Sequence, residues 1–426
     1  MIISTKNSGI SAKELGSAAK QLESYRRHLV GVREKGGFDD LECSINLAFS
    51  KHIDAILEKA EAYRTKQLKI IVVIGIGGSN LGTQAVYDAL PGKNIEILFL
   101  DTVSSTHFTS VFEKLTKQCK NKKQFLLISI SKSGGTTETM ANTEALLFAL
   151  KKPYKDVYDR LVVISDDGSK FFEAAKKQKI DHLGIPKNVG GRYSVFSTVG
   201  LFPLAVAGFD VHKLIEGARG AVEDGLLGDT SQNHALVSAY ATYMHAKNGR
   251  SIHNTFLFAP ELESLGKWYR QLMGESVGKE KDLDGRVVNT GITPIVSIGS
   301  TDLHSMAQLY FGGPDDKFTN IVSIRTSGRV PIPSKLLFPN MVEHLASKSL
   351  DDVMHAIVGG VTAAYQKRKR PFLSIELEAA SEKELGYYLQ FRMVEMMYLA
   401  QLLNVNAFDQ PNVEEYKVQT RKMLAS

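Results

Sequence analysis

The chain has little cysteine, no long apolar run and only a small excess of positive charge. Its 426 residues include two cysteines, Cys43 and Cys119, which are too few for a disulfide framework and fit a reducing compartment. No run approaches the roughly 18 consecutive apolar residues that a membrane-spanning helix requires. Residues 1–20 lack the basic start and apolar centre of a secretory signal peptide. We therefore expect a cytoplasmic location and no membrane partner.

Charge and motif spacing argue against several further classes of function. The 52 basic and 46 acidic residues leave a net charge of +6, and the basic residues are scattered rather than gathered into a nucleic-acid-binding stripe. None of the eleven histidines lies in an HExxH motif or another metal-ligand spacing. No Gly-x-Ser-x-Gly elbow is present. We therefore expect no nucleic-acid partner, no bound metal, no cofactor and no serine-hydrolase chemistry.

What the sequence does contain is an alternation of strand and helix patterns. Eight short apolar runs are typical of buried parallel strands. They cover residues 69–75, 95–101, 124–131, 160–166, 254–260, 293–299, 320–326 and 371–377. Helical periodicity marks residues 136–152, 262–273 and 381–403, and residues 1 to about 68 are expected to be helical. Strands that alternate with helices predict an α/β fold with mostly parallel sheets and helices on both faces.

Length and pattern together indicate two α/β units. A chain of 426 residues exceeds one ordinary domain, and the strand–helix pattern starts again near residue 200. We predict an N-terminal helical segment at residues 1–45, a first α/β domain at 46–200, a second at 201–403, and a C-terminal helix and tail at 404–426. Each α/β domain is expected to be a sandwich of helices on a mostly parallel sheet.

Two loops in the first unit are rich in glycine and hydroxyl side chains. The stretch GIGGSNLG (75–82) follows the first strand and places Ser79 where a helix begins. The stretch SKSGGTTET (131–139) follows another buried strand. In open parallel sheets ligands bind beyond the carboxyl ends of the strands, and helix N-termini favour anions. A phosphate ester, with its three strong acceptor oxygens, is therefore the ligand that we expect between the two loops.

Other interpretations of these loops stay open at this point. A dinucleotide fingerprint starting at Gly75 would need a third glycine where the chain has Asn80, although Asp101 closes the next strand where a ribose-binding acid would lie. The second loop could be no more than a flexible turn. Two such loops in one unit, each after a buried strand, favour one phosphate held between them.

Four residues beyond position 185 are candidates for acid–base chemistry. Arg192 follows two glycines, from where it could stabilise an anion or simply pair with a carboxylate. Glu275 lies just after an amphipathic helix, and His304 lies in a turn after a strand, where Asp302 could orient its ring. Lys417 lies near the C-terminus. Each has a structural alternative, so residue patterns alone predict only a two-unit α/β enzyme that binds a phosphorylated small molecule.

Six motifs, in order along the chain, resemble those of the phosphoglucose isomerase family. They are GIGGSNLG, SKSGGTTET, GGRYS, Gln271 with GESVGK, STDLHS and FDQPNVEEYK, and they span residues 75–417. The resemblance implies two sugar-isomerase (SIS) domains, each an αβα sandwich, and the chain length is similar to that of the compact bacterial members. It also implies an activity in glycolysis and gluconeogenesis, the interconversion of glucose 6-phosphate and fructose 6-phosphate through an enediol or enediolate without a cofactor.

The resemblance further implies roles for the residues of the first motifs. Arg192 would stabilise negative charge on the enediolate, and Glu275 would move a proton between C2 and C1. The phosphate would be held by Gly78, Ser79, Ser131, Lys132, Ser133 and Thr136.

The remaining motifs imply ring opening and a second subunit. His304 and Lys417 would assist opening of the sugar ring, and Gln271 and Gln410 would contact the sugar. In this family the histidine comes from the partner subunit, so the resemblance implies a homodimer with the active site at the subunit interface. Two alternatives remain on this fold: an isomerase that also accepts mannose 6-phosphate, and a non-catalytic regulator that binds a sugar phosphate.

Overall fold

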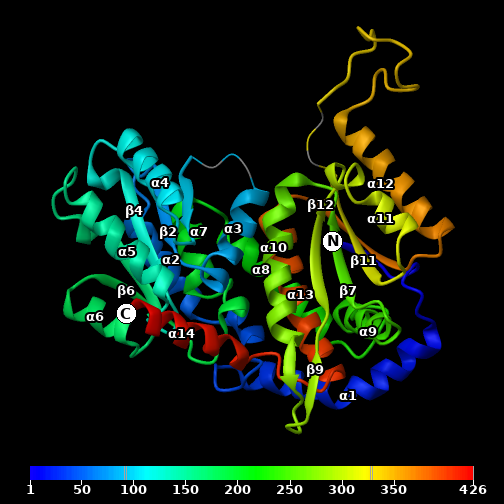
Figure 1. Ribbon diagram of the computed structural model, residues 1–426, viewed down its shortest axis with the longest axis horizontal. Coiled ribbons are helices and arrows are strands. Elements are labelled where there is room, and N and C mark those ends of the chain that lie inside the picture. Colours follow the sequence, from blue (N-terminus) through cyan, green and yellow to red (C-terminus); the bar gives the residue numbers. More distant parts are fainter. Residues whose placement is uncertain (91, 93, 327, 329, 426) are drawn as a thin grey trace.

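Two mostly parallel β-sheets lie side by side and are covered by helices (Figure 1). This arrangement is seen in a computed structural model, which describes residues 1–90, 92, 94–326, 328 and 330–425. The first sheet has the order β3-β2-β4-β5-β6, and every neighbouring pair in it is parallel. Its strands are β2 Ile70–Ile74, β3 Glu96–Leu100, β4 Phe125–Ile130, β5 Leu161–Asp166 and β6 Asp181–Ile185.

The strand order of the first sheet creates a topological switch point. From β2 the chain moves outwards to β3 and then crosses back to β4 on the other side of β2. In such sheets ligands bind outside the carboxyl ends of the strands at this point. All residues of β2 and β4 are buried, as expected for strands covered on both faces. The loops that follow these two strands are the two for which the sequence predicts a phosphate.

The second sheet has the order β1-β12-β11-β7-β10. Its strands are β1 Ile2–Ser4, β7 Ile252–Leu257, β10 Thr293–Ile298, β11 Lys317–Thr326 and β12 Phe372–Ala379. β1 pairs antiparallel with β12 at the edge, and the other pairs are parallel. A short antiparallel hairpin, β8 Lys279–Lys281 and β9 Val287–Thr290, forms a separate two-stranded sheet.

Helices cover the sheets and fill the space between them (Figure 1). In the first unit they are α2 His52–Tyr63, α3 Leu81–Ala89, α4 Ser105–Gln118, α5 Thr137–Leu150, α6 Lys170–Lys177 and α7 Thr198–Ala207. The others are α1 Ala12–Lys35, α8 Val211–Gly225, α9 His234–Lys247, α10 Glu263–Val277, α11 Ala307–Gly312, α12 Leu350–Lys367, α13 Glu382–Leu402 and α14 Glu414–Leu424. Helix α10 packs against α3, which follows the first glycine-rich loop, so the two units meet beside the switch point.

One continuous hydrophobic core joins the two units. Side chains alternate between the faces of a strand, so in β2 Ile71 and Val73 face this core, while Ile70, Val72 and Ile74 face a separate cluster under α4 and α5. The central core also contains side chains of the second sheet and of α8, α10 and α13. A third cluster lies between the second sheet and helices α11 and α12. Shared apolar packing therefore holds the two units together.

The predicted fold class is confirmed, since the protein has an α/β fold with two mostly parallel sheets. All eight predicted strands are present, and the largest difference at any strand end is three residues. The helical prediction for the N-terminus was wrong at residues 2–4, which form β1 because they add to the open edge of β12. Strand β6 and the β8–β9 hairpin were not predicted. The four boundaries given for the domains stay a prediction.

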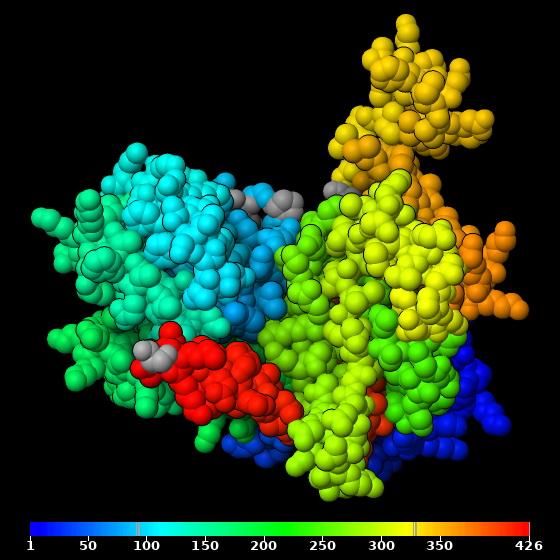
Figure 2. Space-filling model, viewed as in Figure 1, coloured from blue at the N-terminus to red at the C-terminus, as the bar shows by residue number. Residues whose placement is uncertain are grey.

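Two segments shape the surface of the second unit. Residues 330–348, here called the arm, extend away from the rest of the molecule between β11 and α12 (Figure 2). The arm exposes the apolar side chains of Val330, Leu337, Phe338, Met341 and Val342. Helix α14 extends from the second unit across the front of the first in the view of Figure 1. Within the described residues, no helix combines the length and the apolar character needed to cross a bilayer.

Candidate active site

The two hydroxyl-rich loops lie together at the switch point of the first sheet. Ser79 ends a 3₁₀ turn, Gly77–Ser79, shortly after β2, and Ser131 directly follows β4. Because β2 and β4 are parallel neighbours, both loops leave the same edge of the sheet. A Cβ placed on Gly75 would lie 3.1 Å from the carbonyl oxygen of Ile130, so the two loops begin in contact.

The second loop is ordered by its own hydroxyls. The Ser131 Oγ lies 2.9 Å from the Thr136 Oγ1 and accepts a hydrogen bond from the Thr136 N–H (3.4 Å). The Ser133 Oγ accepts from the Gly135 N–H (3.4 Å), and the Ser131 carbonyl accepts from the Gly134 N–H (3.1 Å). Thr136 precedes α5, and its side chain does not cap the helix. The first N–H groups of α5 are thus available to an anion.

Lys132 adds a positive charge to this loop. Its carbonyl accepts hydrogen bonds from the Asp166 N–H (3.1 Å) and from the Ser165 hydroxyl (3.3 Å), which tie the loop to the end of β5. Burial raises the pKa of the Asp166 carboxyl to about 6, against the opposing charge of Lys132. The loop thus combines a lysine, several hydroxyls and a helix N-terminus, which is a chemistry suited to phosphate.

Gly78 allows the first loop to touch a neighbouring turn. A Cβ on Gly78 would lie 2.2 Å from the carbonyl carbon of Gly191, which begins the 3₁₀ turn Gly191–Tyr193. The Ser194 hydroxyl donates to the Gly78 carbonyl (3.3 Å) across the same contact. Only glycine fits such an approach of two backbones. The contact brings Arg192, the middle residue of the second turn, beside the first loop.

Arg192 is almost completely buried and directs its hydrogen bonds to one cluster. Its side chain is 1% exposed. The guanidinium donates to Glu275 Oε2 (3.1 Å) and to Gln410 Oε1 (2.7 Å). It also donates to the Ser276 hydroxyl (2.9 Å), the Asp409 carbonyl (3.0 Å) and the Ala407 carbonyl. Because the five N–H donors of a guanidinium lie in one plane, these acceptors fix both its position and its orientation.

Glu275 lies between Arg192 and Gln271 in the last turn of α10. The predicted helix ended two residues before Glu275, but α10 continues through it, so a helix rather than a loop holds the carboxylate. Gln271, one turn earlier, donates from Nε2 to Glu275 Oε1 (2.9 Å). The same nitrogen would lie 2.8 Å from a Cβ on Gly77, so Gln271 links the carboxylate to the first loop. The Glu275 side chain is 31% exposed, which leaves it open to a substrate.

Three residues of the cluster were missed by the sequence analysis: Ser276, Lys279 and Asp409. The Lys279 ammonium donates to the Glu275 carbonyl (2.9 Å) and to Asp409 Oδ1 (2.9 Å). Burial lowers the pKa of Lys279, and the hydrogen bond to Asp409 opposes that shift. All three lie inside or directly beside the motifs GESVGK and FDQPNVEEYK. Membership of a motif was the available signal, but their mutual contacts join segments about 130 residues apart.

His304 lies in an exposed turn that follows β10. The Asp302 carboxylate accepts hydrogen bonds from the Ser305 hydroxyl (2.9 Å) and from the Ile298 N–H (2.7 Å), so it orders the turn rather than the imidazole. Among the described residues, no hydrogen bond or ion pair joins the His304 ring to the Arg192 cluster. The structure therefore leaves His304 on the surface of the single chain.

Lys417 is also outside the cluster. It lies on α14, is partly exposed and forms an ion pair with Glu414 (2.7 Å). Its motif nevertheless reaches the cluster, because Gln410 and Asp409 in the same motif contact Arg192. Of the predicted residues, the single chain thus brings together those of the loops, the carboxylate, the guanidinium and both glutamines, but not the histidine or this lysine.

The residues that suggested a dinucleotide site serve the fold instead. Asn80 is buried, and its amide donates to Asp101 Oδ2 (3.4 Å). This hydrogen bond ties the first loop to the end of β3. The carboxylate that would bind a ribose is thus engaged within the protein.

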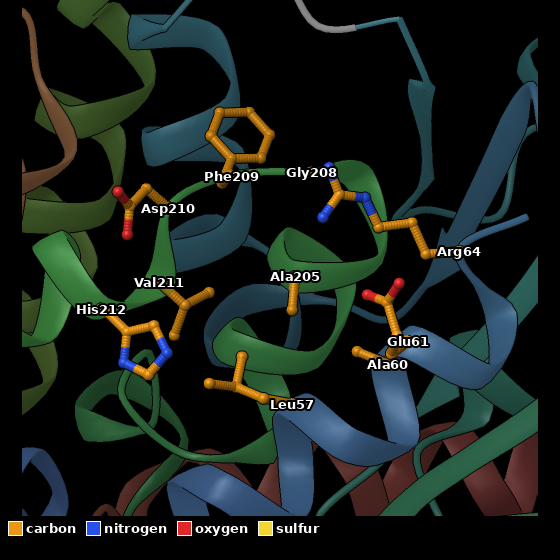
Figure 3. Close-up of a pocket in the computed structure, with 10 residues that line it drawn as sticks. All are labelled: Leu57, Ala60, Glu61, Arg64, Ala205, Gly208, Phe209, Asp210, Val211 and His212. Carbon is orange, nitrogen blue, oxygen red and sulfur yellow. The ribbon is translucent and has the colours of Figure 1, made fainter. Parts of the chain in front are cut away.

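A separate pocket of about 430 Å³ lies between α2, α7 and α8 (Figure 3). The Arg64 side chain extends from α2 along one side of it, towards Gly208. The lining residues are Leu57, Ala60, Glu61, Arg64, Ala205, Gly208, Phe209, Asp210, Val211 and His212. This lining includes none of the predicted site residues.

Known proteins similar to this chain share one description. The family described as phosphoglucose isomerase matches residues 48–426. A glucose-6-phosphate isomerase of Methanocaldococcus jannaschii is 33% identical over 347 residues, which cover 82% of each chain. A glucose-6-phosphate isomerase of Mycoplasmopsis pulmonis is 34% identical over 399 residues, which cover 91% of this chain and 90% of the relative.

Solved structures give the same result for the fold. A hypothetical protein from Thermus thermophilus superposes with a TM-score of 0.90 at 30% identity and covers 100% of both chains. A glucose-6-phosphate isomerase from Chlamydia trachomatis gives a TM-score of 0.84 at 18% identity over 99% of this chain and 88% of the other, which supports the fold alone. The family match and the relatives above 30% identity each cover most of the chain, and the chain belongs to the phosphoglucose isomerase family.

Proposed function

We propose that the protein interconverts glucose 6-phosphate and fructose 6-phosphate by moving a proton between two neighbouring carbons. The family and the relatives named for this activity support the assignment. The structural observation that carries it is the pair Glu275–Arg192, with 3.1 Å between carboxylate and guanidinium, beside two loops suited to phosphate. The reaction needs one base that reaches both carbons and a fixed cation for the oxyanion that develops.

The phosphate group anchors the substrate and takes no part in the chemistry. Ser79 and the loop from Ser131 to Thr136 supply hydroxyls, N–H groups and the Lys132 ammonium at one end of the site. The link from Gly77 through Gln271 to Glu275 sets the distance from this anchor to the base. Binding energy from the phosphate thereby positions C1 and C2, so substrates without it should lose rate as well as affinity.

Proton transfer is assigned to Glu275. Its carboxylate takes the proton from C2 of the open-chain aldose and returns it to C1, while charge builds up on the oxygens of the enediolate. Arg192 lies next to that charge in a nearly water-free environment, where a fixed cation stabilises an oxyanion strongly. Gln271 and Gln410 hold the two groups and remain beside the sugar.

Ring opening is assigned to His304 and Lys417, which must approach the site from elsewhere. His304 is exposed in the single chain, which suits a histidine supplied to the site of a partner subunit. The arm presents a group of exposed apolar side chains, of a kind that marks protein interaction surfaces. Both observations support a homodimer in which each active site lies at the subunit interface.

The substitution Glu275→Gln tests the assignment of the base. It keeps the size of the side chain and its bond to Arg192, and kcat should fall by about 10²–10⁴ because the general base is lost. A matched control is Glu263→Gln on the same helix, where the carboxylate is half exposed and pairs with Lys267. Turnover near that of the parent in the Glu275→Gln protein would remove the base assignment.

Mixed dimers test whether the partner supplies the histidine. Glu275→Gln and His304→Ala proteins should each be nearly inactive alone. In a mixed dimer made by joint refolding, one of the two sites would combine an intact Glu275 with an intact His304 from the other chain. Recovery of turnover on mixing supports the shared site, and two variants that stay inactive together would contradict it.

The alternatives are not favoured. The relatives reported above are named for glucose 6-phosphate, and none is named for mannose 6-phosphate. A non-catalytic regulator would have no need of a carboxylate held between a buried guanidinium and a glutamine amide. The buried thiols of Cys43 and Cys119 are both free, which supports the proposed cytoplasmic location.

A further inference from the structure

Lys279 is buried with three acceptors around its ammonium. The side chain is 5% exposed and donates to the Glu275 carbonyl (2.9 Å), to Asp409 Oδ1 (2.9 Å) and to the Asp409 carbonyl. An ammonium has three donors and no acceptor, so these contacts are those of a protonated lysine. Burying a lysine is costly unless it is paired, and its partners here are the last turn of α10 and the segment 407–410.

The segment 407–410 is the platform on which Arg192 rests. The guanidinium donates to the Ala407 carbonyl, the Asp409 carbonyl and the Gln410 side chain. The Asp409 carbonyl therefore accepts from two cations, Lys279 and Arg192. A displacement of this segment would move the groups that orient the guanidinium.

Apolar packing does not hold the segment on its other side. A pocket of about 400 Å³ separates it from β8, and Lys279 and Asp409 both line that pocket. Polar contacts bridge the gap, namely the Lys279–Asp409 pair and a hydrogen bond from Asn412 Nδ2 to Glu280 Oε2 (2.8 Å). Of these two contacts, the buried pair lies next to the Arg192 cluster.

We propose that Lys279 is a positioning residue for the isomerisation, which clamps the segment 407–410 onto the end of α10 and so sets Arg192 and Gln410 relative to Glu275. The proposal rests on the roles given above to Arg192 and Glu275. Its cation also lies at the C-terminal end of α10, where the helix dipole favours positive charge. Lys279 acts through these neighbours and does not touch the substrate itself.

The expected effect falls on kcat rather than on KM. None of the contacts of Lys279 involves Ser79 or the loop 131–136, so the phosphate anchor stays intact. Misplacing catalytic groups by about 1 Å costs up to roughly 100-fold in rate. Lys279→Met keeps the aliphatic stem and removes the ammonium, and kcat should fall by roughly 10- to 100-fold while KM changes by less than about threefold.

Two controls accompany Lys279→Met. Lys281→Met changes an exposed lysine on the same strand and should leave both kinetic constants unchanged. Asp409→Ala removes the half-exposed carboxylate of the pair, should lower kcat in the same direction, and tests the clamp even if the Lys279 variant does not fold. Inhibition by inorganic phosphate reports whether the anchor is intact in each variant.

A double variant separates positioning from a general loss of structure. If Lys279 acts by holding the segment, Lys279→Met should cost clearly less in a Gln410→Ala background than in the parent. Additive losses, or a Lys279→Met protein with kcat within about twofold of the parent, would overturn the proposal. These results remain distinct from failure of the proposed function, which would show as an inactive parent or an unimpaired Glu275→Gln variant.

Discussion

Replacing Arg192 by lysine separates the geometry of this residue from its charge. The guanidinium makes five hydrogen bonds in the structure, to two side chains of the site, one buried hydroxyl and two carbonyls. Lysine keeps the positive charge but has three donors on one nitrogen. At least two of the five acceptors must therefore lose their bond in Arg192→Lys.

The energetic consequence differs between folding and catalysis. An acceptor that loses its partner costs about 1–3 kcal/mol when buried, but Glu275 and Gln410 are partly open to water, so the loss of stability should stay near the lower end. Removing a well-oriented oxyanion stabiliser costs about 2.7–4 kcal/mol, or about 10²–10³ in kcat. The rate should therefore fall much further than stability does.

The assay is steady-state turnover of fructose 6-phosphate, with the glucose 6-phosphate formed oxidised by a coupled dehydrogenase, together with the thermal midpoint of unfolding. Arg325→Lys is the control, because Arg325 is exposed and pairs only with surface carboxylates, those of Glu376 and Glu378. Loss of kcat with little change in KM supports the account. A rise in KM at normal kcat would refute it, since Arg192 would then only bind the substrate.

Three further predictions concern the loop, the end of β5 and the arm. Thr136→Val keeps the volume but loses the hydroxyl beside Ser131, and kcat/KM should fall about 10- to 100-fold as expected for one bond to a charged group; an unchanged value would place the phosphate elsewhere. Asp166→Asn should gain stability relative to the parent as pH rises from about 4 to 6. Burial raises the folded-state pKa of Asp166 to about 6 from 3.8, so the folded parent holds the proton more tightly than the unfolded chain and loses stability as the proton leaves; urea unfolding across this range measures it, and a constant difference would contradict the shift. Leu337→Asp with Phe338→Asp should convert the dimer to monomers in light scattering, and an unchanged mass would show that the arm is not the interface.

Local signals were sufficient to predict most strands. Strand β2 is made only of isoleucine and valine, is buried throughout and is soon followed by glycine, so its sequence has no competing interpretation. The missed strands lack such a pattern. Strand β6 lies at a sheet edge and begins with a charged residue, while β8 is Lys-Glu-Lys. Such strands form because a partner strand is near, which a local window cannot show.

The candidate site was predictable to the extent that it lies in motifs. The loops, Arg192, Glu275 and both glutamines were identified by resemblance, and the structure brings them together. The cation pair on the Asp409 carbonyl was not, because Lys279 and Arg192 meet there only after three distant segments have folded together. The position of His304 in the assembled site depends on a second chain, which no pattern within one sequence describes.

Deuterium incorporation tests most directly the claim that one carboxylate moves a proton between C1 and C2. Fructose 6-phosphate is converted in D₂O, and the glucose 6-phosphate formed is analysed by NMR for deuterium at C2. We predict that the parent protein introduces deuterium there, because the proton on Glu275 exchanges with solvent, and that Glu275→Gln loses this exchange together with turnover. Product free of deuterium at every stage of the reaction, or exchange that survives in Glu275→Gln, would contradict the mechanism.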